Sequence, residues 1–261
     1  MRPIIIMDSG AGGLTVFEEI SRMMPWLPVI YCADNAGFPY GPRSEDDVIQ
    51  RVSHYLGVLC QQFDPILAVI ACNTASTVAL TRVRKELNIP VVGVVPAIKT
   101  AALHSRNKCI GLLATPGTVK RSYTDNLIDD FASDCEVIRV GSTRLVHLAE
   151  RKLQGEPVAQ WEFDKILEPF AKASQQPDQI VLGCTHFPLV KGELSKSMPT
   201  VAWVDSGEAI ARRVYSLLNH HIPNNPDQPE LQAFLTCDSP AGTRLAFAFA
   251  QRGFGELQVL Q

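Results

Sequence analysis

Short apolar runs rich in valine, isoleucine and leucine recur along the chain and constrain its fold more than any other feature. Most are nearly continuous, as is typical of strands buried on both faces of a parallel sheet. They predict strands at residues 4–7, 29–32, 66–71, 91–95, 109–113, 137–140, 180–182 and 201–204. Helical periodicity between them predicts helices that include residues 16–24, 44–62, 118–131, 144–153 and 208–218. This alternation indicates an α/β protein, and the last strand, helix and strand are expected to return to an existing sheet.

A repeated motif suggests how the chain divides. Asp-Ser-Gly occurs at residues 8–10 and again at 205–207, in each case after a predicted strand. We expect two pseudo-symmetric Rossmann-like α/β lobes with mostly parallel sheets. The first lobe is predicted to combine residues 1–97 with 207–261, and the second to hold residues 98–206. The active site is then expected in the cleft between the lobes.

Composition excludes several classes of protein. The chain has 261 residues, of which 46% are hydrophobic and 20% charged, and its formal net charge is −3. No long basic run favours nucleic acid as a partner. The apolar opening is too short for a signal-peptide core, and no run approaches the roughly 18 apolar residues of a membrane span, so a cytoplasmic protein without a membrane partner is expected. Seven cysteines, an odd number without close pairs, indicate reduced thiols.

Two of the cysteines differ from the rest in their surroundings. Cys72 and Cys184 each follow an apolar run and precede polar residues, and we expect each to lead into a helix-like segment. Open α/β sheets bind ligands at the carboxyl ends of their strands, and a helix N-terminus lowers the pKa of a nearby thiol. The others are interpreted as small buried apolar residues: Cys32, Cys60, Cys109, Cys135 and Cys237.

Two facing thiols suit the inversion of a carbon that carries hydrogen. A base on one face removes the proton and an acid on the other face supplies one. Because the ordinary pKa of cysteine is about 8.5, modest tuning lets one thiol ionise while the other stays protonated. Asp8 is the natural partner of Cys72, and His186 the natural partner of Cys184.

Other interpretations of these residues remain open. Asp8 is also suited to cap a helix. A zinc site from Cys72, Cys184 and His186 lacks an evident fourth ligand. A single-cysteine nucleophile with His186 as its base leaves Cys72 without a role.

The glycine cluster after the first strand raises a dinucleotide-binding hypothesis. Gly10, Gly12 and Gly13 follow that strand, and Asp34 follows the next one. However, Thr15 occupies the position of the third glycine, and the Asp8 carboxylate would repel a pyrophosphate. The pattern therefore disfavours nicotinamide or flavin binding.

Several motifs, taken in order, resemble those of the cofactor-independent glutamate racemases of the aspartate/glutamate racemase superfamily. They span most of the chain and comprise Asp8-Ser9-Gly10 with Gly12-Gly13, Pro39-Tyr40-Gly41, Ala71-Cys72-Asn73-Thr74-Ala75, Val94-Val95-Pro96, Ala114-Thr115 with Gly117-Thr118, and Leu182-Gly183-Cys184-Thr185-His186-Phe187-Pro188-Leu189. The resemblance implies interconversion of L- and D-glutamate for peptidoglycan synthesis, without pyridoxal phosphate, metal or nicotinamide.

The resemblance also implies roles for individual residues. Cys72 and Cys184 match the two acid/base residues, Asp8 and His186 match the groups that assist them, and Glu150 matches the carboxylate that positions the histidine. Without the resemblance, Glu150 fits a solvated helix face better. The matches to substrate-binding positions are Asp8, Ser9, Tyr40, Gly41, Asn73, Thr74, Thr118, Thr185 and His186.

Some of these matches have plainer alternatives. Tyr40 alone would more often pack its ring in a loop, and Asn73 and Thr74 would more often cap a helix. Pro116 departs from the family pattern, which makes it doubtful that the Thr115 side chain contacts the substrate. Thr118 is therefore chosen as the substrate-binding threonine.

The resemblance further implies partners and leaves other functions open. It implies a homodimer and activation by a peptidoglycan precursor. Aspartate or hydantoin racemase is the enzymatic alternative, and a binding protein for an acidic small molecule is the alternative without turnover. The paired thiols argue against mere binding, which does not need them.

Overall fold

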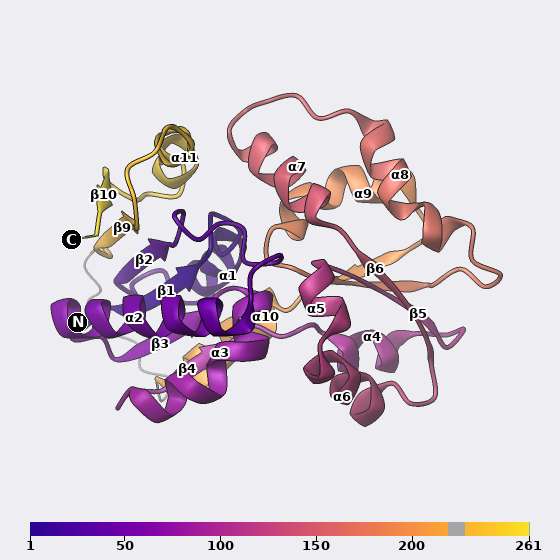
Figure 1. Cartoon of the computed structure of the whole chain (residues 1–261), viewed down its shortest axis with the longest axis horizontal. Coiled ribbons are helices and arrows are strands. Elements are labelled where there is room, and N and C mark those ends of the chain that lie inside the picture. Colours follow the sequence, from indigo (N-terminus) through magenta and orange to yellow (C-terminus); the bar gives the residue numbers. More distant parts are fainter. Residues whose placement is uncertain (219–227, 261) are drawn as a thin grey trace. The chain divides into compact units, whose positions relative to one another are not determined.

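The computed structural model describes residues 1–218 and 228–260, and these form two compact units. One unit is Met1–Val94 with Gly207–Gln261, and the other is Val95–Ser206 (Figure 1). The chain leaves the first unit slightly before residue 97, the boundary expected from sequence. None of the described helices is long and apolar enough to cross a membrane.

The first unit is built on a six-stranded parallel sheet with the order β10-β9-β2-β1-β3-β4. Its strands are β1 (Ile4–Asp8), β2 (Val29–Ala33), β3 (Leu67–Ile70), β4 (Val91–Gly93), β9 (Leu231–Leu235) and β10 (Leu257–Val259). Its helices are α1 (Leu14–Met23), α2 (Glu45–Phe63), α3 (Asn73–Glu86), α10 (Gly207–Leu217) and α11 (Pro240–Ala250). The predicted return of the last strand, helix and strand to an existing sheet is confirmed, since β9 pairs with β2.

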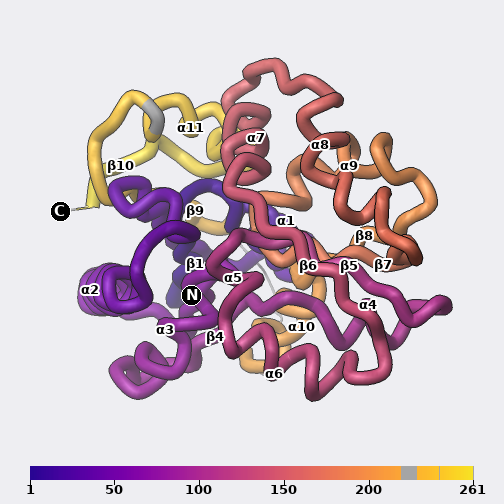
Figure 2. Tube along the Cα trace, turned by 45° about the vertical axis from the view of Figure 1, so that its right-hand side comes forward, coloured from indigo at the N-terminus to yellow at the C-terminus, as the bar shows by residue number. Residues whose placement is uncertain are grey.

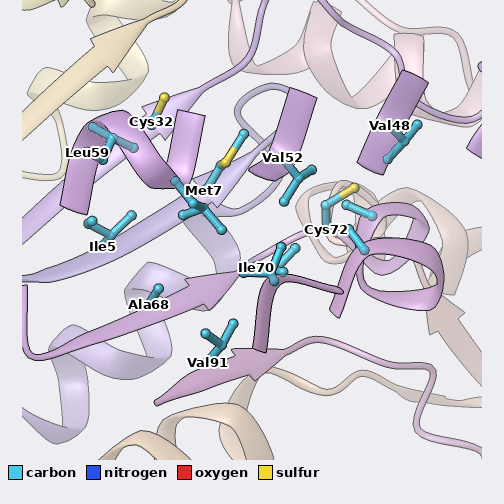
Figure 3. Close-up of a cluster of buried hydrophobic side chains, with 14 of the residues drawn as sticks. Ile5, Met7, Cys32, Val48, Val52, Leu59, Ala68, Ile70, Cys72 and Val91 are labelled. Carbon is cyan, nitrogen blue, oxygen red and sulfur yellow. The ribbon is translucent and has the colours of Figure 1, made fainter. Parts of the chain in front are cut away.

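Side chains that point to one face of the sheet form a hydrophobic core in this unit. Successive strand residues point to opposite faces, so Ile5 and Met7 share one face with Ala68 and Ile70. Residues of α2 and α3 pack on that face, and Figure 3 shows this cluster extending to Cys72 at the end of β3. Both faces of the central strands are buried, which explains their nearly continuous apolar sequence.

The second unit has a four-stranded parallel sheet with the order β6-β5-β7-β8. Its strands are β5 (Cys109–Ala114), β6 (Glu136–Gly141), β7 (Gln179–Gly183) and β8 (Ala202–Val204). Its helices are α4 (Ile98–His104), α5 (Pro116–Lys120), α6 (Ser122–Phe131), α7 (Thr143–Leu153), α8 (Gln160–Ala171), the 3-10 helix η1 (Phe187–Val190) and α9 (Lys191–Ser197). In Figure 2, α4 and α6 lie on one side of this sheet, and α8 and α9 on the other.

One predicted helix is wrong in its extent. The segment 118–131 is not a single helix, because Arg121 is extended with φ −81° and ψ 142° and separates α5 from α6. Thr115 caps α5, so this helix starts before residue 118. The predicted strands are all present, with ends shifted by a few residues.

The two sheets share a feature that locates their ligand-binding edges. In the first unit β1 lies between β2 and β3, and in the second β5 lies between β6 and β7. The chain thus moves to one side of a strand and then to the other, and ligands bind beyond the carboxyl ends of the strands at such a switch point. Asp8 and Cys72 lie there in the first unit, and Thr115 and Cys184 in the second.

Candidate active site

Asp8 is the last residue of β1 and lies buried at the start of α1. The backbone N–H of Gly13 donates to Asp8 Oδ2 at 2.8 Å, and the backbone N–H of Asp34 donates to the Asp8 carbonyl oxygen at 2.8 Å. Asp8 Oδ2 therefore accepts from a backbone donor just before α1, but the N-cap position of α1 is Gly13 and no side chain caps this helix, so the interpretation of Asp8 as its N-cap is wrong. A carboxylate at this helix N-terminus takes the place where a dinucleotide pyrophosphate would bind, which argues against that hypothesis.

Cys72 lies at the neighbouring strand end and begins α3. The pairing of β1 and β3 reaches this point, because the Ala71 N–H donates to the Met7 carbonyl oxygen at 2.7 Å. Cys72 is buried and extended at the N-cap position of α3, and its carbonyl oxygen accepts from the Ser76 N–H. The expected position of Cys72 at a helix N-terminus is confirmed. The positive end of a helix dipole favours a thiolate at such a position.

Residues next to Cys72 provide polar groups at the same edge. Asn73 and Thr74 form the first turn of α3 and are buried. The Asn73 Nδ2 has no hydrogen-bond partner among the described residues. Buried donors are normally satisfied, so an unsatisfied one at a strand end is typical of a binding site. Ser9, which follows Asp8, is also buried.

Tyr40 has its hydroxyl committed to another side chain. The hydroxyl donates to Asp34 Oδ2 at 2.6 Å, and the ring packs in the apolar cluster that contains Cys72. Burial and the adjacent Asp34 carboxylate raise the pKa of Tyr40 well above its usual value. The plainer interpretation, a ring packed in a loop, is thus confirmed. Gly41 follows it and is half-buried.

Cys184 follows β7 but does not begin an α-helix. A turn closes when the Phe187 N–H donates to the Cys184 carbonyl oxygen at 3.0 Å, and the short 3-10 helix η1 starts at Phe187. The prediction that each cysteine leads into a helix-like segment is confirmed for both, with an α-helix after Cys72 and a 3-10 helix followed by α9 after Cys184. Cys184 is therefore not at the N-terminus of an α-helix, unlike Cys72.

A buried histidine lies between Cys184 and a carboxylate. His186 Nδ1 is 3.9 Å from Cys184 Sγ, and His186 Nε2 is 2.7 Å from Glu150 Oε1. Burial opposes charge on the ring, but the contacts with Cys184 and Glu150 outweigh it and raise the pKa of His186 well above its usual value. The three side chains form a chain along which a proton can be held near the thiol.

Glu150 occupies the buried face of α7. Its exposed fraction is 7%, and Leu145, Val146, Leu148 and Ala149 of the same helix are also buried. The interpretation of Glu150 as part of a solvated helix face is wrong. The contact with His186 is the one that the family resemblance implies.

Thr115 and Thr118 bond to each other at the start of α5. Thr115 Oγ1 accepts from the Thr118 N–H at 3.3 Å, and the two hydroxyl oxygens are 3.1 Å apart. Pro116 occupies the first helical turn, where a missing N–H costs nothing. Thr118 has no exposed surface, and Thr115 directly follows Ala114, the last residue of β5. Thr185 is buried beside Cys184.

Asp34 is the residue at this edge that sequence analysis misjudged. The dinucleotide hypothesis included Asp34, but this carboxylate is fully buried and accepts hydrogen bonds from Tyr40, Arg51 and Thr236. Its oxygens are committed to these donors, which further disfavours dinucleotide binding. Across the described ranges, no group of three or more histidine, cysteine or acidic side chains is arranged to hold a metal ion.

Comparison with known proteins gives a consistent result. The sequence pattern of the Asp/Glu/hydantoin racemase family matches residues 4–214. The chain is 46% identical over 258 residues to a glutamate racemase of Klebsiella pneumoniae, covering 98% of this chain and 91% of that protein.

Solved structures agree with the sequence comparison. An Escherichia coli glutamate racemase, solved with L-glutamate and the activator UDP-MurNAc-Ala, superposes with a TM-score of 0.94 at 45% identity and covers 100% of this chain and 98% of that one. A glutamate racemase of Bacillus anthracis gives a TM-score of 0.84 at 29% identity and covers 99% of this chain and 96% of that one. Together with the two thiols at equivalent strand ends, these similarities show that the chain belongs to the Asp/Glu/hydantoin racemase family.

Proposed function

We propose that this protein is a glutamate racemase that interconverts L- and D-glutamate by a two-base mechanism. The observation that carries the proposal is that Cys72 and Cys184 lie at equivalent strand ends of the two sheets, with His186 Nδ1 3.9 Å from Cys184 Sγ. The high identity to glutamate racemases over nearly the whole chain supports glutamate as the substrate.

In the proposed reaction, one cysteine thiolate removes the α-proton and becomes a thiol. The electron pair of the broken C–H bond is held by the α-carbon and its carboxylate. The other cysteine, as a thiol, donates its proton to the opposite face and becomes a thiolate, so that charge and protons balance. Cys72 and Cys184 exchange these roles when the reaction runs in reverse.

In this proposal, neighbouring side chains assist proton transfer by the two thiols. Asp8 assists Cys72 at the adjoining strand end, and His186 assists Cys184. Glu150 orients the imidazole of His186 and stabilises its protonated form through the 2.7 Å contact. The mechanism assigns no role to pyridoxal phosphate, metal or nicotinamide.

Substrate binding is assigned to neutral donors. They suit this task because hydroxyl, amide and backbone groups bind carboxylates without a concentrated positive charge that would acidify both thiols. Tyr40 contributes through its backbone, since its hydroxyl is held by Asp34. The proposed neutral donors are Ser9, Tyr40, Gly41, Asn73, Thr74, Thr118 and Thr185, and the ionisable side chains of Asp8 and His186 complete the proposed set.

The proposal extends to the setting of the reaction. D-Glutamate formed in the cytoplasm would supply peptidoglycan synthesis. A peptidoglycan precursor would act as activator, as UDP-MurNAc-Ala does for the Escherichia coli glutamate racemase. The protein would act as a homodimer whose protomers each use both units. Residues 1–97 with 207–261 and residues 98–206 would be the two lobes that supply Cys72 and Cys184.

A racemisation assay separates glutamate from the substrates of sister enzymes. Purified protein is incubated with L- or D-glutamate, L- or D-aspartate, or a 5-substituted hydantoin, with and without UDP-MurNAc-Ala, and optical activity is followed. Loss of ellipticity from both enantiomers of glutamate alone is expected. Racemisation of aspartate or hydantoin instead would reassign the substrate, and binding of glutamate without loss of ellipticity would favour a binding protein.

A further inference from the structure

Asp34, which directly follows β2, is a fully buried carboxylate with an unusual number of donors. Arg51 donates to both of its oxygens, at 2.6 Å from Nε and 2.7 Å from the terminal nitrogen. Tyr40 and Thr236 donate their hydroxyls at 2.6 Å each, and the Gly37 N–H donates at 3.2 Å. Burial opposes the charge of Asp34, but these donors hold the pKa of its carboxyl below its usual value. The Asp34 carboxylate is therefore ionised, and it is the shared acceptor of all these hydrogen bonds.

Arg51, a residue of α2, binds the Asp34 carboxylate through both of its oxygens. Its side chain is mostly buried, and its guanidinium lies 5.7 Å from the centre of the Tyr55 ring. A planar guanidinium that forms two bonds to one carboxylate fixes both position and angle, which a lysine cannot do. Asp34 therefore has a defined orientation relative to α2.

The segment between Asp34 and α2 is held at several points. Arg43 donates to the Gly37 carbonyl oxygen at 2.5 Å and pairs with Asp47 at 2.6 Å. The backbone of Gly37 lies close to the Asp34 side chain, since a Cβ atom added at Gly37 would be 2.4 Å from Asp34 Oδ2. Among the described residues, the backbone N–H groups of Tyr40 and Gly41 donate no hydrogen bond. The segment is therefore anchored by side chains while two backbone donors remain unused.

We infer that Asp34 and Arg51 are positioning residues that fix Tyr40 and thereby orient the Tyr40 and Gly41 backbone toward the substrate. The inference rests on the proposed function and adds to it two residues with no contact to the reacting carbon. The Tyr40 hydroxyl acts on substrate binding through Asp34 rather than by touching a substrate carboxylate.

A double-mutant cycle tests this positioning. Tyr40→Phe keeps the packed ring and removes the hydroxyl that donates to Asp34. Arg51→Lys keeps the positive charge and removes the bidentate hydrogen bonds to Asp34. Each single variant is expected to raise KM for glutamate about three- to tenfold with kcat nearly unchanged, and the double variant to raise it by less than the product of the two, because both act through Asp34. Arg82→Met, which removes an exposed ion pair with Glu86 in α3, is the matched control and should leave KM unchanged.

Amide hydrogen exchange provides a second measurement that does not depend on turnover. Residues 36–43 should exchange faster in Tyr40→Phe and Arg51→Lys than in the wild type or Arg82→Met. Lower thermal stability with unchanged KM and unchanged exchange in this segment would overturn the inference, because the network would then serve stability alone.

The same variants separate this inference from the proposed function. If the wild type racemises glutamate but the variants keep its KM, only the positioning inference fails. If the wild type binds glutamate without turnover, the proposed function fails, and calorimetric Kd values of the variants then test the positioning. A wild type that neither binds nor racemises glutamate would contradict both.

Discussion

His186 Nε2 lies 2.7 Å from Glu150 Oε1, and both side chains are buried. This contact fixes which ring nitrogen faces the carboxylate and leaves Nδ1 for Cys184, 3.9 Å away. A carboxylate that orients an imidazole also stabilises its protonated form, as in the Ser-His-Asp triad of serine proteases. The electrostatics of Cys184 therefore depend on a residue 36 positions away in the sequence.

Glu150→Gln is expected to lower the pKa of His186. With the carboxylate gone, burial becomes the larger influence on the ring and disfavours its charge. Turnover should fall by up to roughly a hundredfold, the lower end of the range for a positioned acid–base group, because Glu150 acts through His186. NMR titration of the imidazole nitrogens measures the pKa. Glu156→Gln, which removes an exposed partner of Arg151, is the control, and an unchanged His186 pKa in Glu150→Gln would contradict the account.

The same contact predicts how stability depends on pH. Because the pKa of His186 is raised on folding, the folded state holds this proton more tightly than the unfolded chain. The resulting stability is fully present below about pH 6.5, the ordinary histidine pKa, and is lost as pH rises through the folded-state value. The wild type should therefore lose more stability than Glu150→Gln as pH rises over this range. Chemical denaturation at a series of pH values checks this, and parallel profiles would contradict it.

Cys72→Ser and Cys184→Ser should each reduce racemisation by about 10²-fold or more, because a serine hydroxyl is too weak an acid to replace either thiol. Cys60→Ser and Cys135→Ser are matched controls, since each changes a partly buried cysteine in the same unit as one of the candidates. Steady-state rates with both glutamate enantiomers measure the effect. Near wild-type turnover in either candidate variant would overturn the two-base assignment.

Gly13→Ala should disturb Asp8 and lower stability. A Cβ at Gly13 would lie 2.7 Å from Tyr31 Oη, 2.9 Å from Ala71 Cβ and 3.0 Å from Asp8 Cβ. Relieving these contacts is expected to cost about 1–3 kcal/mol and to displace the Asp8 carboxylate, so turnover should fall as well.

Gly57→Ala is the opposite case in the same unit. Gly57 lies within α2, and a Cβ there would contact nothing within 4 Å. Alanine should stabilise the helix by about 0.5–1 kcal/mol and leave turnover unchanged. Denaturation midpoints and rates of the two variants check both expectations. Equal effects of the two substitutions would show that crowding around Asp8 has no importance.

The sequence was sufficient for the strands because burial on both faces leaves a continuous apolar run, as at β1 and β3. It was less reliable for helices in the second unit. Periodicity runs smoothly through Arg121, and only its extended backbone separates α5 from α6. Helix α8 was not among the predicted helices, and Pro169 within it is a residue that normally argues against a helix.

The sequence predicts a site residue when a reactive side chain directly follows a recognisable strand. Cys72 and Cys184 were found because each thiol follows an apolar strand and precedes polar residues. The burial of Glu150 and the ion pair of Asp34 with Arg51 depend on tertiary packing, which brings together residues 36 and 17 positions apart. The pattern of a single helix shows neither.

Solvent exchange at the α-carbon tests the central claim most directly. The wild type, Cys72→Ser and Cys184→Ser are each incubated with D-glutamate, and with D-aspartate alongside, in deuterated water with a chelator and no added cofactor. Loss of the α-proton signal is followed by NMR, with and without UDP-MurNAc-Ala. We predict exchange of glutamate alone by the wild type, with formation of the L-enantiomer, and no such conversion by either variant. No exchange by the wild type under any of these conditions, or full conversion by a variant, would contradict two-cysteine glutamate racemisation.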